Sequence, residues 1–537
     1  MRRVSHGNVG RSVGSGTTPE PLSKRGFAHA FALCFVVLAT AGFLAARIPV
    51  LMHRPFDPDE FEHAHAAWCV FKGMLPYKDF FEHHTPWYYY TLAPFFHWFD
   101  VDLSFESAKH FLLFGRGLSL ALTTLSMVLL ALVGRLWKDR GVGLVAALFL
   151  VGQPFFFQKT IEMRPDVLAL PFFLASLGFL LRGLAAGTDE ARRRLRSFVG
   201  GGLSVGAAIL CTQKMLFVLP GAIAGMVIWS LFAGCGRRRR IVLTAAFLLS
   251  VCLPVALTWA AFALRGAGHA FIANNFLLNA SWKHVEAEQF RNLIRTSRPI
   301  LILAGLGTLV SLYHFIRSEQ RPFEGILLFC TVVGLFAGLL VIPVAYRQYY
   351  LMPLPIVCLF ASQGLFVFLG RVRDGARPWL LVLAMLPLAV LPVLDMRATL
   401  KLRNDNQLAR LRYVFETTKP TDVVMDGWEG MGVFRPHAFY YFFLHGELID
   451  RLPREKVDAY LAALESGKIR PRLIAMDENL VALGSRFLRF VKANYARKDV
   501  PGQERQAGSE WRRFFKKVLR KNDGAWEGFY FSRDGFD

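Results

Sequence analysis

The stretch FAHAFALCFVVLATAGFLAARIPV, residues 27–50, is followed shortly afterwards by FDPDEFEHAH, residues 56–65. The first stretch is apolar and long enough to cross a hydrocarbon core, which takes about 20 residues of helix. The second packs two aspartates, two glutamates and two histidines into ten positions. This order predicts a membrane-spanning helix with a dense acidic segment at its edge.

The rest of the chain supports a membrane protein. Of its 537 residues 54% are hydrophobic and only 19% are charged, and the apolar residues fall in long runs. A soluble domain does not have this pattern. The further spans that we predict are about 108–135, 142–157, 166–183, 198–213, 216–234, 241–264, 299–317, 323–343, 351–370 and 379–395, giving about eleven in all.

Basic residues set the expected topology. Arg2, Arg3, Lys24 and Arg25 precede the first span, which is too long for a cleaved signal peptide and predicts a retained signal-anchor with a cytoplasmic N-terminus. Alternating the sides then places the basic runs on the N-terminal side, as the positive-inside rule requires. These runs are Lys138 and Arg140, Arg192 to Arg196, Arg237 to Arg240, Arg317 and Arg321, and Arg371, Arg373 and Arg377.

The same runs explain the net charge of +23 and the pI of about 10.0. Basic residues that face anionic head groups fit this pattern better than nucleic-acid binding, because no stacking aromatics lie between them. Of the seven cysteines only Cys69 lies plainly on the outer side, so no structural disulfide is expected.

After residue 395 the sequence becomes charged and mixed. DVVMD (422–426) and RLIAMD (472–477) predict short buried strands, 457–467 and 479–497 have helical periodicity, and VLRKNDGAWEGFYF (518–531) predicts a hairpin. The predicted organisation is a cytoplasmic tail (1–26), a transmembrane domain (27–395) with an outer catalytic loop at 51–107, and a small α/β domain (396–537) on the outer face. The chain has no Walker motif and no CxxC pair.

Two acidic segments share the first outer loop. If residues 59–71 form a helix, Asp59, Glu62 and His63 lie on one face. A second segment, DFFEHHTPWYYY (79–90), carries Glu82 ahead of interfacial aromatics. Carboxylates from both pieces suggest a catalytic cavity. The alternatives are a solvated loop, and a helix cap formed by Asp59 with Glu62 three residues later.

These residues resemble the first outer loop of the multi-pass glycosyltransferases of the GT-C fold. The similarity is to the bacterial branch of the dolichyl-phosphate-mannose protein mannosyltransferases, which includes aminoarabinose lipid A transferases and rhizobial lipopolysaccharide galacturonosyltransferases. TIEMRPDVLAL (160–170), CTQKMLFVLP (211–220) and YRQYYLMPLP (346–355) are similar to the later turns of the family, and the resemblance covers roughly residues 27–395. His83 and His84 stand where lipid A transferases carry a lysine.

The resemblance implies an α-helical membrane enzyme that moves a sugar, with inversion, from a polyprenyl-phosphate donor to a glycan, glycolipid or protein acceptor. It implies a multi-pass protein of the bacterial inner membrane with a periplasmic C-terminal domain. Asp59 is the expected general base and Glu82 a second catalytic acid. The expected substrate-binding residues are Glu60, His84, Arg164, Asp166, Lys214, Arg347 and Tyr349. The cations among them would meet the leaving phosphate, although Arg164 and Asp166 could instead pair with each other.

No cofactor is required by this scheme. A divalent metal is an alternative, because Asp57, Asp59, Glu60, His63, His65, Glu82, His83 and His84 form a rich ligand set. A transporter or flippase of lipid-linked sugars is the main competing function. Such proteins place charges in mid-helix, whereas these ionisable residues gather at outer turns. A polymerase or ligase of surface polysaccharide is a third hypothesis.

Overall fold

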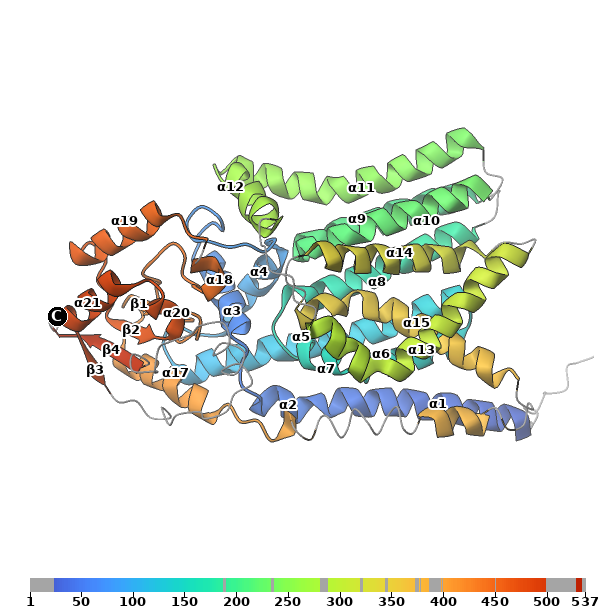
Figure 1. Cartoon of the computed structure of the whole chain (residues 1–537), viewed down its shortest axis with the longest axis horizontal. Helices are drawn as coiled ribbons and strands as arrows, with labels where there is room; N and C mark the ends of the chain where they lie inside the picture. The colour runs from blue at the N-terminus through green and yellow to red at the C-terminus, as the bar shows by residue number, and fades with distance from the viewer. Residues whose placement is uncertain are drawn as a thin grey trace, which may run out of the picture.

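The computed structural model describes residues 24–186, 190–232, 236–280, 288–318, 322–342, 346–371, 376, 378–385, 397, 399–449, 451–498 and 528–533. Long helices lie side by side along the long axis of the molecule, and a smaller region with a sheet covers one end of them (Figure 1). We call that end the domain end of the bundle.

The long helices follow the apolar runs of the sequence. They are α1 (Lys24–Ala45), which the short α2 (Arg47–His53) continues, α5 (Phe105–Trp137), α6 (Arg140–Val151), α8 (Pro165–Ala185), α9 (Ala191–Cys211), α10 (Val218–Phe232), α11 (Arg237–Ala263), α13 (Glu288–Arg317), α14 (Phe323–Val341) and α15 (Pro353–Leu369). Short helices connect them: α7 (Pro154–Lys159), η2 (Gln213–Phe217), α12 (Gly268–Ile272), η3 (Ala273–Leu278) and η4 (Arg347–Leu351).

Seven helical segments in the described part of the chain are long and apolar enough to cross a membrane. Two of the predicted spans correspond to the shorter apolar helices α6 and α15. A third, 198–213, falls in α9, whose first turn is rich in arginine. Most of the eleventh predicted span, 379–395, lies outside the described residues. The helical membrane architecture is therefore confirmed, whereas the number of spans remains a prediction.

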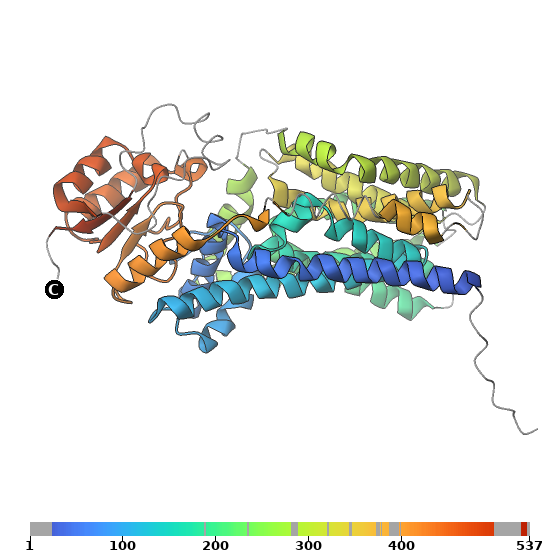
Figure 2. The same ribbon diagram turned by 90° about the horizontal axis from the view of Figure 1, so that it is seen from below.

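Two of the basic segments, at the starts of α1 and α11, lie at the end opposite the domain end. Helix α12 follows α11 and lies at the domain end, so the arginines that begin α11 lie at the far end (Figure 1). Helix α1 likewise begins at the far end and runs alongside the bundle toward α2 (Figure 2). This distribution agrees with the predicted alternation of charged loops.

The first loop lies between the bundle and the C-terminal region. It forms α3 (Pro58–Phe71), α4 (Trp87–Leu92) and η1 (Ala93–Trp98). The Phe81 N–H donates to the Tyr440 carbonyl at 2.8 Å. Gly430, at φ +79°, approaches α3 so closely that a Cβ there would lie 2.3 Å from Cβ of Phe61. A side chain at this position would therefore push the C-terminal region away from α3.

The C-terminal region contains a four-stranded sheet in the order β1-β2-β4-β3. Strand β1 pairs parallel with β2, in the register Val424 to Leu473, and β4 pairs antiparallel with both β2 and β3. The strands are β1 (Val424–Asp426), β2 (Leu473–Met476), β3 (Tyr495–Lys498) and β4 (Gly528–Ser532), and the helices are α17 (Asp405–Thr417), α18 (Gly446–Ile449), α19 (Arg454–Glu465), α20 (Glu478–Val481) and α21 (Ser485–Asn494).

The α/β character predicted for this region is confirmed. Strands β1 and β2 lie within the two predicted strand segments, and α19 covers most of the predicted helix at 457–467. The segment 479–497 is not one helix but α20, α21 and then β3, because Gly484 breaks it at φ +97°. Of the predicted hairpin at 518–531, only 528–531 lies within the described residues, where it belongs to β4.

Candidate active site at the domain end of the bundle

Helix α3 is capped two residues before Asp59, the residue that the alternative to a catalytic base would make the cap. Asp57 is the N-cap: its side chain accepts the N–H of Asp59 at 3.2 Å, and the Glu60 carboxylate accepts the N–H of Asp57 at 2.9 Å. Pro58 occupies the first helical position, where its missing N–H costs nothing. The alternative in which Asp59 and Glu62 form the capping box is therefore wrong, and the Asp59 carboxylate points elsewhere.

Glu60 anchors α3 to α5. Both of its oxygens accept hydrogen bonds from the Arg116 guanidinium, at 2.6 and 2.8 Å, and one also accepts the N–H of Met163 at 3.1 Å. Both side chains are fully buried. The substrate contact that we expected of Glu60 has no support in this geometry, because its oxygens are already taken. It positions the helix instead.

The carboxylates of Asp57 and Asp59 meet a cationic turn just before α8. Arg164 lies 3.0 Å from Asp57 and 2.8 Å from Asp59, while Lys159 lies 3.0 Å from Asp57. Glu162 contacts both cations of this turn. The TIEMRPD segment therefore contributes a buried network in which acids and bases alternate.

The two aspartates differ in charge compensation. Burial raises the pKa of Asp57, but Lys159 and Arg164 outweigh it, and the pKa falls well below its ordinary value. The pKa of Asp59 is raised by burial, with Arg164 opposing this and the Asp57 charge adding to it. The Asp59 side chain is also the more exposed, at 23% against 9% for Asp57. Asp59 therefore combines access with a raised proton affinity.

Lys214 and Asp166 form a second pair beside the first. Their charged atoms lie 2.8 Å apart, and the Lys214 ammonium lies 4.0 Å from the centroid of the Tyr349 ring. The alternative in which Arg164 pairs with Asp166 is therefore wrong, since Arg164 contacts Asp57, Asp59 and Glu162. The turn at Lys214 and the turn at Tyr349 converge as expected.

Arg347 lies on the same turn as Tyr349 but has neutral partners. Its guanidinium donates to Gln158 at 2.7 Å and to Gln289 at 3.1 Å, and it packs against the ring of Phe155. No carboxylate in the described part of the chain forms an ion pair with it. Its charge is thus available to an anion.

Glu82 and His84 lie in a third group, with Glu62 and His83. One Glu82 oxygen accepts the N–H groups of His83 and His84, at 2.8 and 3.0 Å, and lies 2.9 Å from Nδ1 of His84. Ligand atoms of all four side chains lie within 4.8 Å of one another. Two carboxylates and two imidazoles are a donor set that suits a divalent cation.

Burial dominates the electrostatics of this third group. It raises the pKa of Glu62, with Glu82 adding to the effect, and lowers the pKa of His83 and of His84 to about 3. The two imidazoles are therefore neutral at physiological pH. Neutral rings keep a lone pair for a metal or for a hydrogen bond from a substrate.

Sequence reasoning missed three side chains of these networks. Arg116 lies inside a predicted span, and Lys159 ends the apolar run before TIEMRPD. An ionisable residue at membrane depth is itself a sign of a partner or a function, so Arg116 and Lys159 could both have been indicated by their positions. Arg54 lies 2.6 Å from Glu162. The sequence does not indicate this contact, because Arg54 follows the end of the first apolar run, where an arginine is expected to face water.

Comparisons with known proteins agree with the fold. The family model described as dolichyl-phosphate-mannose-protein mannosyltransferase matches residues 93–259. No curated protein sequence matches at a significant level. Among solved structures, ArnT from Cupriavidus metallidurans in the apo state aligns with a TM-score of 0.60 and 13% identity, over 88% of this chain and 97% of its own.

Two ligand-bound structures are also similar. ArnT bound to undecaprenyl phosphate aligns with a TM-score of 0.51 and 14% identity, over 86% of this chain and 88% of its own. AglB, the oligosaccharyltransferase of Archaeoglobus fulgidus, in complex with an inhibitory peptide and a dolichol-phosphate, aligns with a TM-score of 0.55 and 12% identity, over 90% of this chain and 75% of its own.

The chain therefore has the GT-C fold of membrane glycosyltransferases, as its sequence resemblance predicted. Within that class, its residues 93–259 carry the pattern of the dolichyl-phosphate-mannose-protein mannosyltransferases.

Proposed function

We propose that this protein is a membrane glycosyltransferase that moves a sugar from a polyprenyl-phosphate donor to an acceptor hydroxyl. The observation that carries the proposal is the partly exposed Asp59 carboxylate beside Arg164, at the bundle end where Lys214 and Arg347 also lie. The match to a family of lipid-linked sugar transferases and the undecaprenyl phosphate in the ArnT structure support the choice of donor.

Asp59 is the proposed general base. It takes the proton of the acceptor hydroxyl as the acceptor oxygen attacks the anomeric carbon from the side opposite the phosphate. The bond from that carbon to the phosphate oxygen breaks, and its electron pair leaves on the lipid phosphate. One such displacement inverts the anomeric centre. Arg164 holds the carboxylate in place at 2.8 Å before the acceptor arrives.

Lys214 and Arg347 are proposed to bind the phosphate as its charge grows. The Lys214 ammonium is held between Asp166 and the Tyr349 ring, which fixes its position near the base. Among the described residues, the Arg347 guanidinium donates to two neutral amide oxygens, and a phosphate oxygen in their place would add an opposite charge. Both cations act where negative charge develops, which is the most effective place for electrostatic stabilisation.

Glu82 and His84 are proposed to position the acceptor. If a divalent cation is bound, Glu62, Glu82, His83 and His84 are the residues that hold it, and its charge would offset that of the donor phosphate. We further propose that the domain end faces the periplasm of a bacterial inner membrane, because the basic starts of α1 and α11 lie at the opposite end. The acceptor is then a cell-envelope glycan, a lipopolysaccharide component or a protein.

A transfer assay with defined donors tests this function. The purified full chain is incubated with undecaprenyl-phosphate-linked pentose, hexose or uronic acid and with a membrane glycolipid extract, and release of undecaprenyl phosphate is measured. We expect one donor to be consumed with a matching mass gain on one acceptor. Movement of intact donor between leaflets of proteoliposomes, without cleavage in the presence of any acceptor fraction, would instead identify a flippase.

A strain that lacks the gene provides an independent measurement. The mass profile of its envelope glycolipids and glycoproteins should lack one pentose, hexose or uronic acid on a single component. That loss would name the sugar and the acceptor together. An unchanged profile, together with no donor cleavage in vitro, would contradict the proposal.

A further inference from the structure

A second cluster of ligand-type side chains lies outside the candidate active site, where α3 meets the C-terminal region. His65 and Cys69 lie four residues apart on α3 and therefore share one face of the helix. His437 approaches them from a point 372 residues later in the chain. One ligand atom of each residue lies within 4.8 Å of the others.

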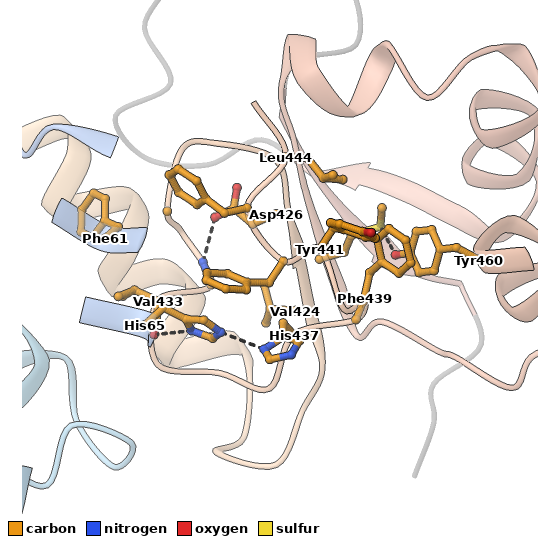
Figure 3. Close-up of a pocket in the computed structure, with 16 residues that line it drawn as sticks. Phe61, His65, Val424, Asp426, Val433, His437, Phe439, Tyr441, Leu444 and Tyr460 are labelled. Carbon is orange, nitrogen blue, oxygen red and sulfur yellow. Dashed lines mark hydrogen bonds between the residues drawn. The ribbon is translucent and has the colours of Figure 1, made fainter. Parts of the chain in front are cut away.

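The orientation of the rings is that of a metal-binding pair. Nδ1 of His65 lies 2.8 Å from the Val433 carbonyl, which accepts its proton, so Nε2 presents a lone pair to the cluster. That Nε2 lies 2.8 Å from Nδ1 of His437, and Sγ of Cys69 lies 3.9 Å from the same atom. Figure 3 shows His65 between the Val433 carbonyl and His437. A histidine that donates its other N–H to a backbone carbonyl is the usual outer-shell arrangement of a zinc ligand.

The distances need only small adjustments to accept an ion. Tetrahedral bonds of about 2.05 Å to nitrogen and 2.3 Å to sulfur separate two nitrogens by roughly 3.3 Å, and a nitrogen and a sulfur by roughly 3.5 Å. The two imidazoles would have to separate slightly, and the thiol would have to move slightly closer. His437 is the least buried of the three residues, and it lies outside the named helices and strands, in a bridge to Val424.

The surroundings are otherwise apolar. Trp68 and Phe442 pack against His65 with ring centroids 5.4 and 4.5 Å away, and Phe80 lies 6.5 Å from His437. Cys69 and His65 are buried. The alternative to a metal site is a hydrogen bond between the two imidazoles, with Cys69 packed beside them as a small apolar side chain. That alternative gives the Cys69 sulfur no ligand role, whereas a zinc ion at this place would bond to it.

We propose that His65, Cys69 and His437 bind one Zn²⁺ ion that joins α3 to the C-terminal region. On binding, the Cys69 thiol loses its proton to solvent and the thiolate bonds to the metal. Three protein ligands leave a fourth position, which we assign to water because no further ligand joins this cluster among the described residues. Since α3 also carries Asp57 and Asp59, the ion would hold the aspartate-bearing helix against the C-terminal region.

Metal binding by the full chain in detergent tests the proposal without an assay of transfer. The chelator-treated protein is titrated with Co²⁺, whose bond to a thiolate gives a sulfur-to-metal charge-transfer band. We expect the band at one equivalent, and we expect Zn²⁺ to abolish it by displacement. Cys69→Ser should remove the band, and His437→Asn should weaken zinc binding at least about 100-fold.

Matched variants assign the metal to this cluster. Cys358→Ser removes another buried cysteine, on α15, and should leave the band unchanged. His84→Gln alters the group formed by Glu62, Glu82, His83 and His84, and should also leave the band unchanged because that group contains no sulfur.

A measurement on the wild-type chain tests the site even if a variant does not fold. The X-ray absorption spectrum of the zinc-loaded wild-type chain should contain one sulfur neighbour at about 2.3 Å. Only nitrogen and oxygen neighbours, or a cobalt band that persists in Cys69→Ser, would overturn the proposal. Either outcome is independent of whether the protein transfers sugars.

Discussion

Asp59→Asn is the most informative substitution in the candidate active site. Asparagine keeps the size of the side chain and an oxygen that can accept from Arg164, which lies 2.8 Å from the Asp59 carboxylate. It cannot take a proton. Loss of a general base costs about 10²- to 10⁴-fold in rate, which corresponds to about 2.7–5.4 kcal/mol of barrier at 1.36 kcal/mol per factor of ten.

The same substitution should leave the fold intact. Arg164 retains Asp57 and Glu162, and Asp57 rather than Asp59 caps the helix. Burial raises the pKa of Asp59 above its ordinary value, so its negative charge disfavours the folded state at neutral pH. A neutral side chain removes that cost. We therefore expect the melting temperature of Asp59→Asn to equal or slightly exceed that of the wild type.

The assay combines release of polyprenyl phosphate with a melting curve on the same preparation. Asp100→Asn is the matched control, because Asp100 is an exposed aspartate of the same loop, outside the ion network. It should leave both readouts unchanged. A folded Asp59→Asn protein with wild-type transfer would refute the assignment of the base, whatever its stability.

Three further predictions concern the neighbouring groups. Lys214→Ala and Arg347→Ala should each lower kcat/KM for the lipid-phosphate donor roughly 10- to 160-fold, the equivalent of about 1.5–3 kcal/mol for a hydrogen bond to a charged group, and unchanged donor kinetics in both would show that these cations only anchor turns. Glu60→Gln should lower the melting temperature markedly, because it leaves the Arg116 charge buried and unpaired at a cost of about 3–5 kcal/mol, and a wild-type melting curve would contradict this. Burial, with Asp477 adding to it, raises the pKa of Asp426 to about 8, so the folded state binds the extra proton and stability should fall as pH rises from about 4 to about 8. Burial also raises the pKa of Asp477 to about 7, so Asp426→Asn should make the melting profile between pH 5 and 8 less steep without levelling it, and a slope equal to that of the wild type would contradict this.

Much of the local structure follows from the sequence. Helix α3 spans Pro58–Phe71, close to the helix expected at 59–71, because its apolar positions recur at helical spacing and Pro58 starts it favourably. The sequence leaves two caps open, because Asp57 and Asp59 each have a glutamate three residues later. The proline decides between them, since it is preferred at the first helical position and a cap at Asp59 would leave it outside the helix.

The sequence does not predict which charged side chains form ion pairs with one another. Arg164 and Asp166 are near neighbours in sequence, yet Arg164 is the N-cap residue of α8 and points to α3, while Asp166 lies in the first turn of α8 and faces Lys214. Which side chain meets which depends on how α3, α8 and η2 pack. The same holds for His437, which lies beside Val424 of β1 in a bridge and meets His65 of α3 from there.

The carboxylates of the acidic segment 56–65 thus have different roles, which the number of acidic residues alone does not distinguish. Asp57 caps α3 and is neutralised by Lys159 and Arg164, and Glu60 is fully occupied by Arg116. Neither carboxylate can accept a proton from a substrate without breaking the helix start. Asp59 has one cationic contact, which it shares with two other acids, and it keeps the larger exposed fraction. Its neighbours hold the helix, so their removal should cost stability, whereas removal of the Asp59 charge should cost only chemistry.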